Sequence, residues 1–118
     1  MNIYEAIKSR HSVRSYFDQS IPNDIISQLN DEIEVCNRES GLHIQLVTDE
    51  PEAVSGFMAH YGKFSGVRNY IALIGRKASD LDEKLGYYGE RIAVKAQQFG
   101  LNTCWVAMTF SKKKADVL

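Results

Sequence analysis

The sequence has little of what several large classes of protein require. Only two of its 118 residues are cysteines, Cys36 and Cys104, too few for the disulfide framework of a small secreted domain. Its longest apolar stretches are about six residues, whereas a transmembrane helix needs about 20. The first ten residues contain no apolar core of a secretory signal. We therefore expect a cytoplasmic protein with reduced thiols and no membrane contact.

An excess of charge of one sign is also lacking. The sequence has 14 Lys and Arg residues against 15 Asp and Glu residues, a net charge of -1. No global basic field would gather nucleic acid, and Lys112–Lys114 is interpreted as a solvated face. His43 and His60 lack the spacing of metal ligands, so we expect no metal site. Without a linker, repeat or low-complexity tract, residues 1–118 are treated as one domain.

The apolar periodicity predicts helices that alternate with strands. Helices are expected near residues 3–10, from Asn23 or Asp24 to Gly41, and over 80–99; strands are expected at 43–48, 70–75 and 102–108. Such an alternation favours an α/β or α+β arrangement in two or three layers. Apolar residues cover more than one face of the long helix, which predicts burial in a core or in a subunit interface.

Two guanidinium groups, an imidazole and a hydroxyl fall within the segment Arg10-His11-Ser12-Val13-Arg14. Arginine forms forked, charge-assisted hydrogen bonds with phosphate, and a serine hydroxyl adds a neutral donor. In an extended backbone Arg10, Ser12 and Arg14 would point to the same side. The segment is therefore a candidate phosphate site. The alternative is a solvated basic turn in which Arg10 stabilises the end of the first helix.

The pair Cys104-Trp105 invites comparison with papain-type nucleophiles. The glycine that precedes such a cysteine is missing, and no His–Asn pair follows it. We therefore predict that Cys104 is a buried, inert thiol and that Cys36 lies in the core. No Ser–His–Asp order or carboxylate pair stands out, so no catalytic side chain is nominated.

Several segments together resemble the FMN-dependent nitroreductase superfamily. Ile3–Phe17 matches its opening, a short helix followed by Arg-x-Ser-x-Arg and then an aromatic residue. Pro22–Ile26 resembles the entry to its second helix, and Phe99–Val106 resembles the end of its central helix and the strand that follows. Within the superfamily, Lys84–Glu90 is most similar to the thermophile-type nitroreductase branch.

The resemblance implies an α+β, nitroreductase-like fold, a three-layer α/β/α sandwich whose central sheet is accompanied by a long central helix. Residues 1–118 would form the N-terminal portion of this FMN-binding domain. Superfamily chains usually continue with a further strand, a helix and basic phosphate-contacting residues. This sequence stops at Lys112–Leu118, where the pattern predicts the first turns of another helix, so we expect a fold that is incomplete at the C-terminus.

The resemblance also implies which residues bind the cofactor. Those expected at the FMN phosphate and ribityl chain are Arg10, His11, Ser12 and Arg14. Those expected near the flavin ring are Trp105, Val106, Ala107 and Met108. NAD(P)H would reduce FMN, which would pass electrons to a small-molecule acceptor such as a nitroaromatic or a quinone. The implied protein is a homodimeric oxidoreductase; the alternative is a non-catalytic flavin-binding or dimerising fragment.

Overall fold

The computed structural model describes residues 1–51 and 64–106, and the expected α+β composition is confirmed in them. The helices are α1 (Ile3–Ser9), α2 (Asn23–Ser40) and α4 (Leu81–Gln98), and the strands are β1 (Gln45–Val47) and β2 (Tyr70–Ala72). Each lies within a segment whose type the periodicity predicts. Among the described residues, no helix has both the length and the apolarity needed to cross a membrane.

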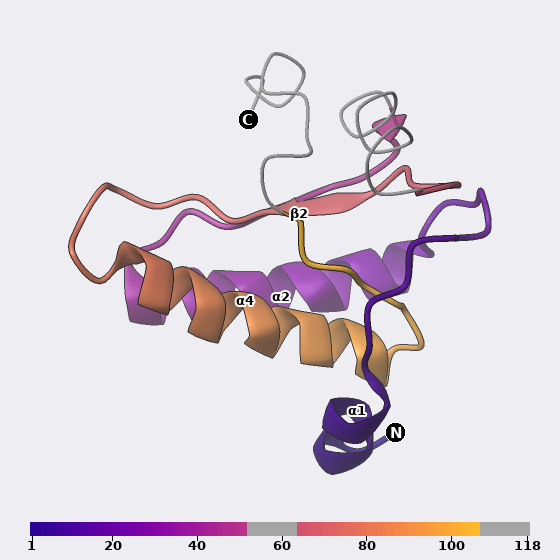
Figure 1. Ribbon diagram of the computed structural model, residues 1–118, viewed down its shortest axis with the longest axis horizontal. Helices are drawn as coiled ribbons and strands as arrows, with labels where there is room; N and C mark the ends of the chain where they lie inside the picture. Colours follow the sequence, from indigo (N-terminus) through magenta and orange to yellow (C-terminus); the bar gives the residue numbers. More distant parts are fainter. Residues whose placement is uncertain (52–63, 107–118) are drawn as a thin grey trace.

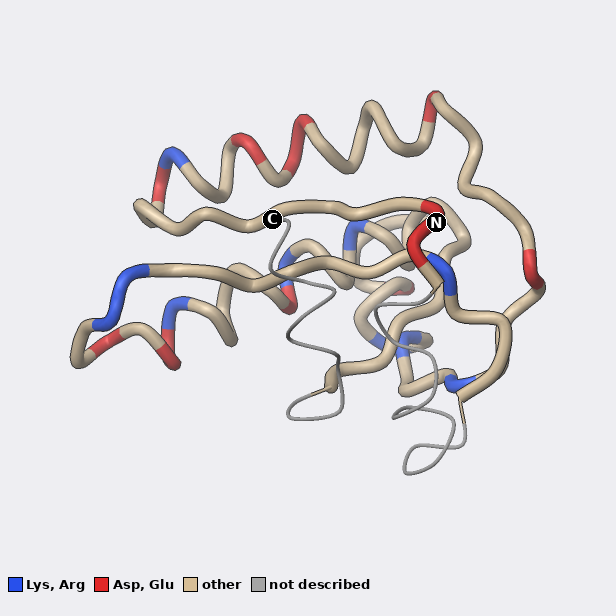
Figure 2. Tube along the Cα trace, turned by 90° about the horizontal axis from the view of Figure 1, so that it is seen from above, with Lys and Arg blue, Asp and Glu red and all other residues tan. Residues whose placement is uncertain are grey.

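The two strands form an antiparallel pair that lies along one face of the two long helices (Figure 1). Gln45 pairs with Ala72, and Val47 pairs with Tyr70. Seen from above, the strands run between the lines of α2 and α4, and acidic and basic residues are interspersed on both helices (Figure 2). The sheet and these helices make two layers of the expected three-layer sandwich; a second helical layer is not among the residues described.

The ends of α2 follow from local chemistry. Gly41 closes the helix with a φ of 76°, and its amide donates to the Asn37 carbonyl at 2.8 Å. The side chain of Asn37 then brackets Ile44, accepting from its amide and donating to its carbonyl at 2.8 and 3.0 Å. The prediction that Asn23 or Asp24 caps the helix is wrong: Pro22 is the N-cap residue, and it has no side-chain oxygen to accept an amide hydrogen.

The core lies between α2, α4 and the sheet. Its buried members are Ile33, Cys36, Leu42, Ile44 and Ile92. Buried positions on α4 are spread around its circumference: Gly89, Ile92, Ala93, Val94, Ala96 and Gln97. The expectation that this helix is buried on more than one face is confirmed, and Cys36 is a core residue as predicted. Arg91 of α4 adds a polar clamp, since it contacts both Glu32 and Glu39 of α2.

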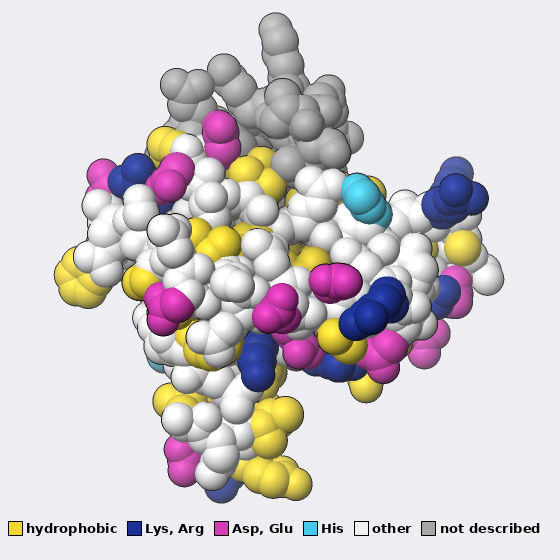
Figure 3. All heavy atoms as spheres, turned by 180° about the vertical axis from the view of Figure 1, so that it is seen from behind, with side chains coloured by type: hydrophobic (Ala, Val, Ile, Leu, Met, Phe, Trp, Pro, Cys, Tyr) yellow, Lys and Arg dark blue, Asp and Glu magenta, His cyan; other side chains and the backbone are white. Residues whose placement is uncertain are grey.

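Helix α1 projects from the body of the molecule and contacts α4 (Figure 1). Ala6 is fully buried, whereas Ile3, Tyr4 and Ile7 are more than half exposed. These side chains contribute to the apolar surface of the projection at the bottom of Figure 3. Beyond α1, an extended segment reaches two distant parts of the chain through isolated parallel bridges, Ser12 with Thr103 and Ser15 with Ser65.

The strand expected at 102–108 is wrong over residues 102–106, where only Thr103 makes a bridge. The N-terminal extended segment pairs with Thr103 at Ser12, but three residues later, at Ser15, it pairs with Ser65 instead. Neither contact therefore extends into a ladder. The remaining part of that prediction, residues 107–108, lies outside the described residues.

Candidate functional site

The two segments that the sequence singled out lie against each other. The amide of Val13 donates to the Thr103 carbonyl at 3.1 Å. One terminal nitrogen of Arg10, Nη1, donates to the Thr103 hydroxyl at 3.2 Å. Residues 93 positions apart thus meet at one place. Thr103 joins the segments through both its backbone and its side chain.

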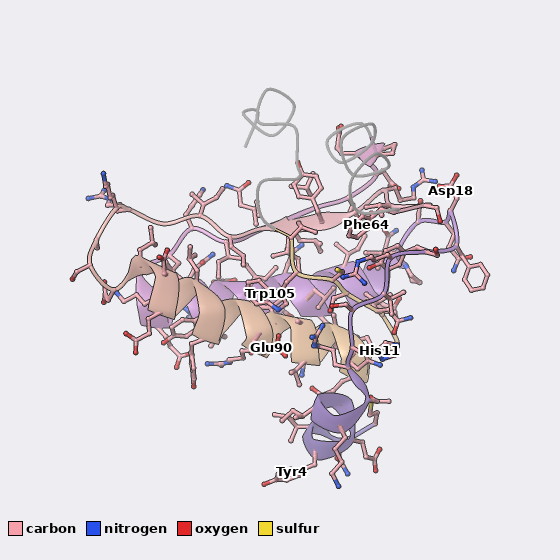
Figure 4. The ribbon with its side chains drawn as sticks, in the orientation of Figure 1. Tyr4, His11, Asp18, Phe64, Glu90 and Trp105 are labelled. Carbon is pink, nitrogen blue, oxygen red and sulfur yellow. The ribbon has the colours of Figure 1, made fainter. Side chains whose placement is uncertain are left out.

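Glu90 of α4 completes this junction, although no sequence motif pointed to it. Its Oε2 lies 3.1 Å from Nε of Arg10, and its Oε1 accepts from the indole nitrogen of Trp105 at 2.8 Å. One carboxylate therefore holds one residue from each predicted segment (Figure 4). The available signal was a carboxylate directly after the buried Gly89 and two positions before the buried Ile92.

The remaining members of the basic segment are more open to solvent than Arg10. His11, Ser12 and Arg14 are exposed, whereas the Arg10 side chain is 16% exposed. The His11 ring is hydrogen-bonded through Nδ1 to the Ser9 carbonyl at 2.9 Å. The guanidinium of Arg14 lies 6.0 Å from the centroid of the Phe64 ring, at the edge of the range for a cation–π contact. The segment and its neighbour therefore offer two hydroxyl groups, those of Ser12 and Thr103. They also offer the exposed Arg14 and the ion-paired Arg10.

Tyr16 packs directly beside this segment. Its hydroxyl donates to the Val13 carbonyl. Burial of the phenol raises the pKa of Tyr16 to about 12; Cys104 adds to the rise, and Arg14 and Arg10 oppose it. The Tyr16 phenol is therefore neutral at physiological pH and acts as a hydrogen-bond donor.

A cavity of about 720 Å³ adjoins the junction. Its walls come from β2, from the small residues Gly89, Ala93 and Ala96 of α4, and from residues 100–106. Its volume lies within the ~300–1,000 Å³ typical of small-molecule sites, and its lining is mostly apolar. Of the residues predicted to lie near a flavin ring, Trp105 and Val106 line this cavity, whereas Ala107 and Met108 lie outside the described residues.

The cavity and the basic segment are neighbours but not one surface. Arg10, Ser12 and Arg14 are not among the lining residues, and Thr103 belongs to both places. A ligand that used both would place an anionic group beside Thr103 and an apolar part in the cavity. The donors present, two guanidinium groups and two hydroxyls, suit a phosphate ester. The residues therefore fit the phosphate and the flat apolar ring of a flavin mononucleotide.

The two thiols differ in their surroundings. Cys104 is half-buried, with Sγ 3.5 Å from the Trp105 carbonyl oxygen, so the prediction of a buried thiol is wrong. Cys104 is one of the residues that line the cavity. In the ranges 1–51 and 64–106, no three His, Cys, Asp or Glu side chains gather as metal ligands.

The sequence was compared with protein families, curated proteins and solved structures. A family model described as "Putative TM nitroreductase" matches residues 2–118. No curated protein matches the sequence. No solved structure matches it either.

Proposed function

Because the chain belongs to the Putative TM nitroreductase family, a membership that supports a general oxidoreductase role, we propose that it is an FMN-dependent oxidoreductase. The observation that carries the proposal is the contact between Arg10 and Thr103, which brings the basic segment to the rim of the apolar cavity. Neither segment alone would suit a flavin nucleotide. Together they offer an anion site and an apolar site within reach of one ligand.

In this proposal the basic segment holds the phosphate and ribityl chain. Arg10 and Arg14 supply charge-assisted hydrogen bonds, Ser12 adds a hydroxyl donor, and His11 stands at the exposed edge. Trp105 and Val106 flank the ring in the cavity, and Ala107 and Met108 are proposed to continue that wall. The apolar lining excludes water from the ring. When bound, FMN supplies the redox chemistry, taking hydride from NAD(P)H and passing electrons to a nitroaromatic, quinone or similar acceptor.

The proposed protein is a homodimer in the cytoplasm. The exposed apolar face of α1, formed by Ile3, Tyr4 and Ile7, supports an association between two copies, because projecting apolar side chains gain from burial. Both cysteines are free, which favours a reducing compartment.

A second candidate function is a flavin-free structural or dimerising domain. The ion pair between Arg10 and Glu90 favours it, since an arginine already neutralised by a carboxylate serves the fold without any ligand. In the first candidate function the basic segment binds a ligand; in the second it only holds α4 in place.

The proposal is tested by titrating the purified full chain with FMN and, in parallel, with riboflavin, which lacks the phosphate. We expect FMN to bind more tightly than riboflavin, and the flavin absorbance to bleach with NADH or NADPH in the absence of oxygen. A chain that takes up neither flavin at any concentration would overturn the proposal and leave the structural alternative.

The phosphate contact is tested by the double variant Arg10→Ala/Arg14→Ala. It should weaken FMN binding by about 2–4 kcal/mol, given about 1.5–3 kcal/mol for each hydrogen bond to a charged group and a discount for the existing Glu90 pair. Riboflavin binding should change much less. The control Arg38→Ala/Arg76→Ala removes the same charge from exposed positions on other segments. Equal FMN affinities in the two double variants would refute the site.

A further inference from the structure

Glu90 occupies the atoms of Arg10 that a phosphate would use. Its Oε2 is 3.1 Å from Nε, and Nη1 is directed to the Thr103 hydroxyl. An arginine binds a phosphate through two adjacent N–H groups, and here the Nε–H of one such pair faces a carboxylate. Phosphate and carboxylate are both anions, and they compete when both approach the same N–H group. A ligand phosphate that binds Arg10 through its Nε side therefore replaces Glu90.

The Glu90 side chain has room to leave. It is 44% exposed, whereas the Arg10 side chain is 16% exposed. Moving the more exposed partner into water breaks fewer packing contacts than moving the more buried one. The expected response to a bound anion is thus that Arg10 keeps its place beside Thr103 and the Glu90 carboxylate swings out.

That movement would also affect Trp105. The indole nitrogen donates to the other Glu90 oxygen at 2.8 Å, so a departing carboxylate takes away its acceptor. The ring itself is 42% exposed and lines the apolar cavity. Trp105 thereby connects the anion site with the cavity through a single side chain of α4.

We propose that Glu90 is an internal substitute for the ligand phosphate, which pairs with Arg10 until a phosphate ester displaces it and thereby releases the indole of Trp105 at the cavity wall. This inference rests on the phosphate site of the proposed function. Glu90 is a positioning residue in this scheme: it acts through Arg10 and Trp105. Because Glu90 competes with the phosphate for Arg10, it weakens phosphate binding. Its release couples the anion site to the apolar cavity.

The first test compares the parent with Glu90→Gln, using ribose 5-phosphate as a probe and titration calorimetry as the readout. Glutamine keeps the shape and an oxygen acceptor for the indole but removes the competing charge. We expect about two- to fivefold tighter binding, the range for losing a partly exposed ion pair. Glu39→Gln is the matched control, because it removes the same charge from another arginine pair, at Arg91, and it should bind as the parent does.

The second test reads the emission of Trp105 in the parent and in Glu90→Ala. Trp105 is the one tryptophan of the chain, so its emission reports this site alone. Ribose 5-phosphate has no aromatic ring to quench it. We expect the emission of the parent to shift as the probe saturates, and Glu90→Ala without probe to show the emission of the saturated parent.

The outcomes separate this inference from the proposed function. If the parent prefers FMN to riboflavin but Glu90→Gln binds the probe no more tightly, or Trp105 emission stays constant through saturation, the substitute role is wrong and the phosphate site stands. If neither protein binds the probe and the parent does not distinguish FMN from riboflavin, both proposals fail. Tighter binding by Glu90→Gln together with the emission shift in the parent supports both.

Discussion

The indole ring of Trp105 rests on Gly89 of α4, so closely that a Cβ at position 89 would lie 2.5 Å from Cη2 of the ring. The same Cβ would lie 2.9 Å from Cδ1 of Leu73. A glycine in a helix interior costs about 0.5–1 kcal/mol relative to alanine. Here that cost is offset by the close approach of the ring, whose nitrogen then reaches Glu90 in the next position along the helix.

This contact predicts opposite effects for two glycines of one helix. Gly89→Ala should lower the free energy of unfolding by about 1–3 kcal/mol, because the added methyl group overpacks against Trp105 and Leu73. Gly86→Ala should raise it by about 0.5–1 kcal/mol, because nothing lies within 4 Å of the added Cβ. Urea unfolding measures both. Trp105 emission should change in Gly89→Ala alone, and a stabilised Gly89→Ala would contradict the packing.

A second pair of glycines separates backbone strain from steric overlap. Gly66 and Gly41 have similar φ values, 73° and 76°. A Cβ at Gly66 would lie 2.9 Å from the carbonyl carbon of Tyr16 and closer still to its oxygen, whereas a Cβ at Gly41 meets nothing within 4 Å. Gly41→Ala should therefore cost about 1–2 kcal/mol of strain. Gly66→Ala should cost about 1–3 kcal/mol more, since the bridge between Ser15 and Ser65 must also shift.

Thermal and urea unfolding of these two variants give the comparison directly. Equal losses of stability would show that the approach of Gly66 to Tyr16 does not constrain the fold.

The clamp between α2 and α4 depends on one arginine. Arg91 contacts Glu32 at 2.8 Å and Glu39 at 2.7 Å, and its side chain is 34% exposed. Arg91→Met should lower the free energy of unfolding by about 1–2 kcal/mol, more than for an isolated surface pair and less than for a buried one. Arg91→Lys keeps the charge but loses the forked geometry of the guanidinium. Its free energy of unfolding should lie between those of Arg91→Met and the parent. Urea midpoints that do not differ among the three proteins would refute the clamp.

Tyr16 should make the protein sensitive to alkaline pH. An unfolded tyrosine ionises near pH 10. Because the pKa of Tyr16 is raised to about 12 in the folded protein, its neutral form persists there while the unfolded chain loses its proton. The free energy of unfolding should therefore be unaffected by this group below pH ~10 and should fall as the pH rises from about 10 to about 12.

Tyr16→Phe should show a smaller fall in melting temperature over that pH window, although it loses the hydrogen bond to Val13 and is less stable at neutral pH. The control Tyr87→Phe removes an exposed phenol and keeps Tyr16. Identical alkaline profiles for the parent and Tyr16→Phe would contradict the burial of this phenol.

The helices and strands were predictable because their signals are local. The spacing of Leu29, Ile33 and Cys36 predicts the buried face of α2, and Gly41 marks its end. The apolar run at 70–75 predicts β2 in the same way. Adjacent elements and the family resemblance then lead to the α+β class. None of these steps needs a contact between distant residues.

The site was predictable only in outline, because its details depend on how distant segments meet. The motif at Arg10–Arg14 indicated an anion site. The pairing of Arg10 with Glu90, however, depends on which face of α4 lies against residues 103–105. The partial exposure of Cys104 has the same origin, since it depends on the cavity wall. Contacts that depend on tertiary packing produce no periodic pattern in the sequence.

The two bridges of the N-terminal extended segment also bear on how the chain folds. Ser12 must find Thr103, and Ser15 must find Ser65, so this segment takes its backbone partners from residues far along the chain. Closing such long loops is entropically unfavourable before the contacts form, and contacts between distant residues slow folding. We therefore expect α2, β1 and their local contacts to form early, with the docking of residues 10–16 as the slow, late step of folding.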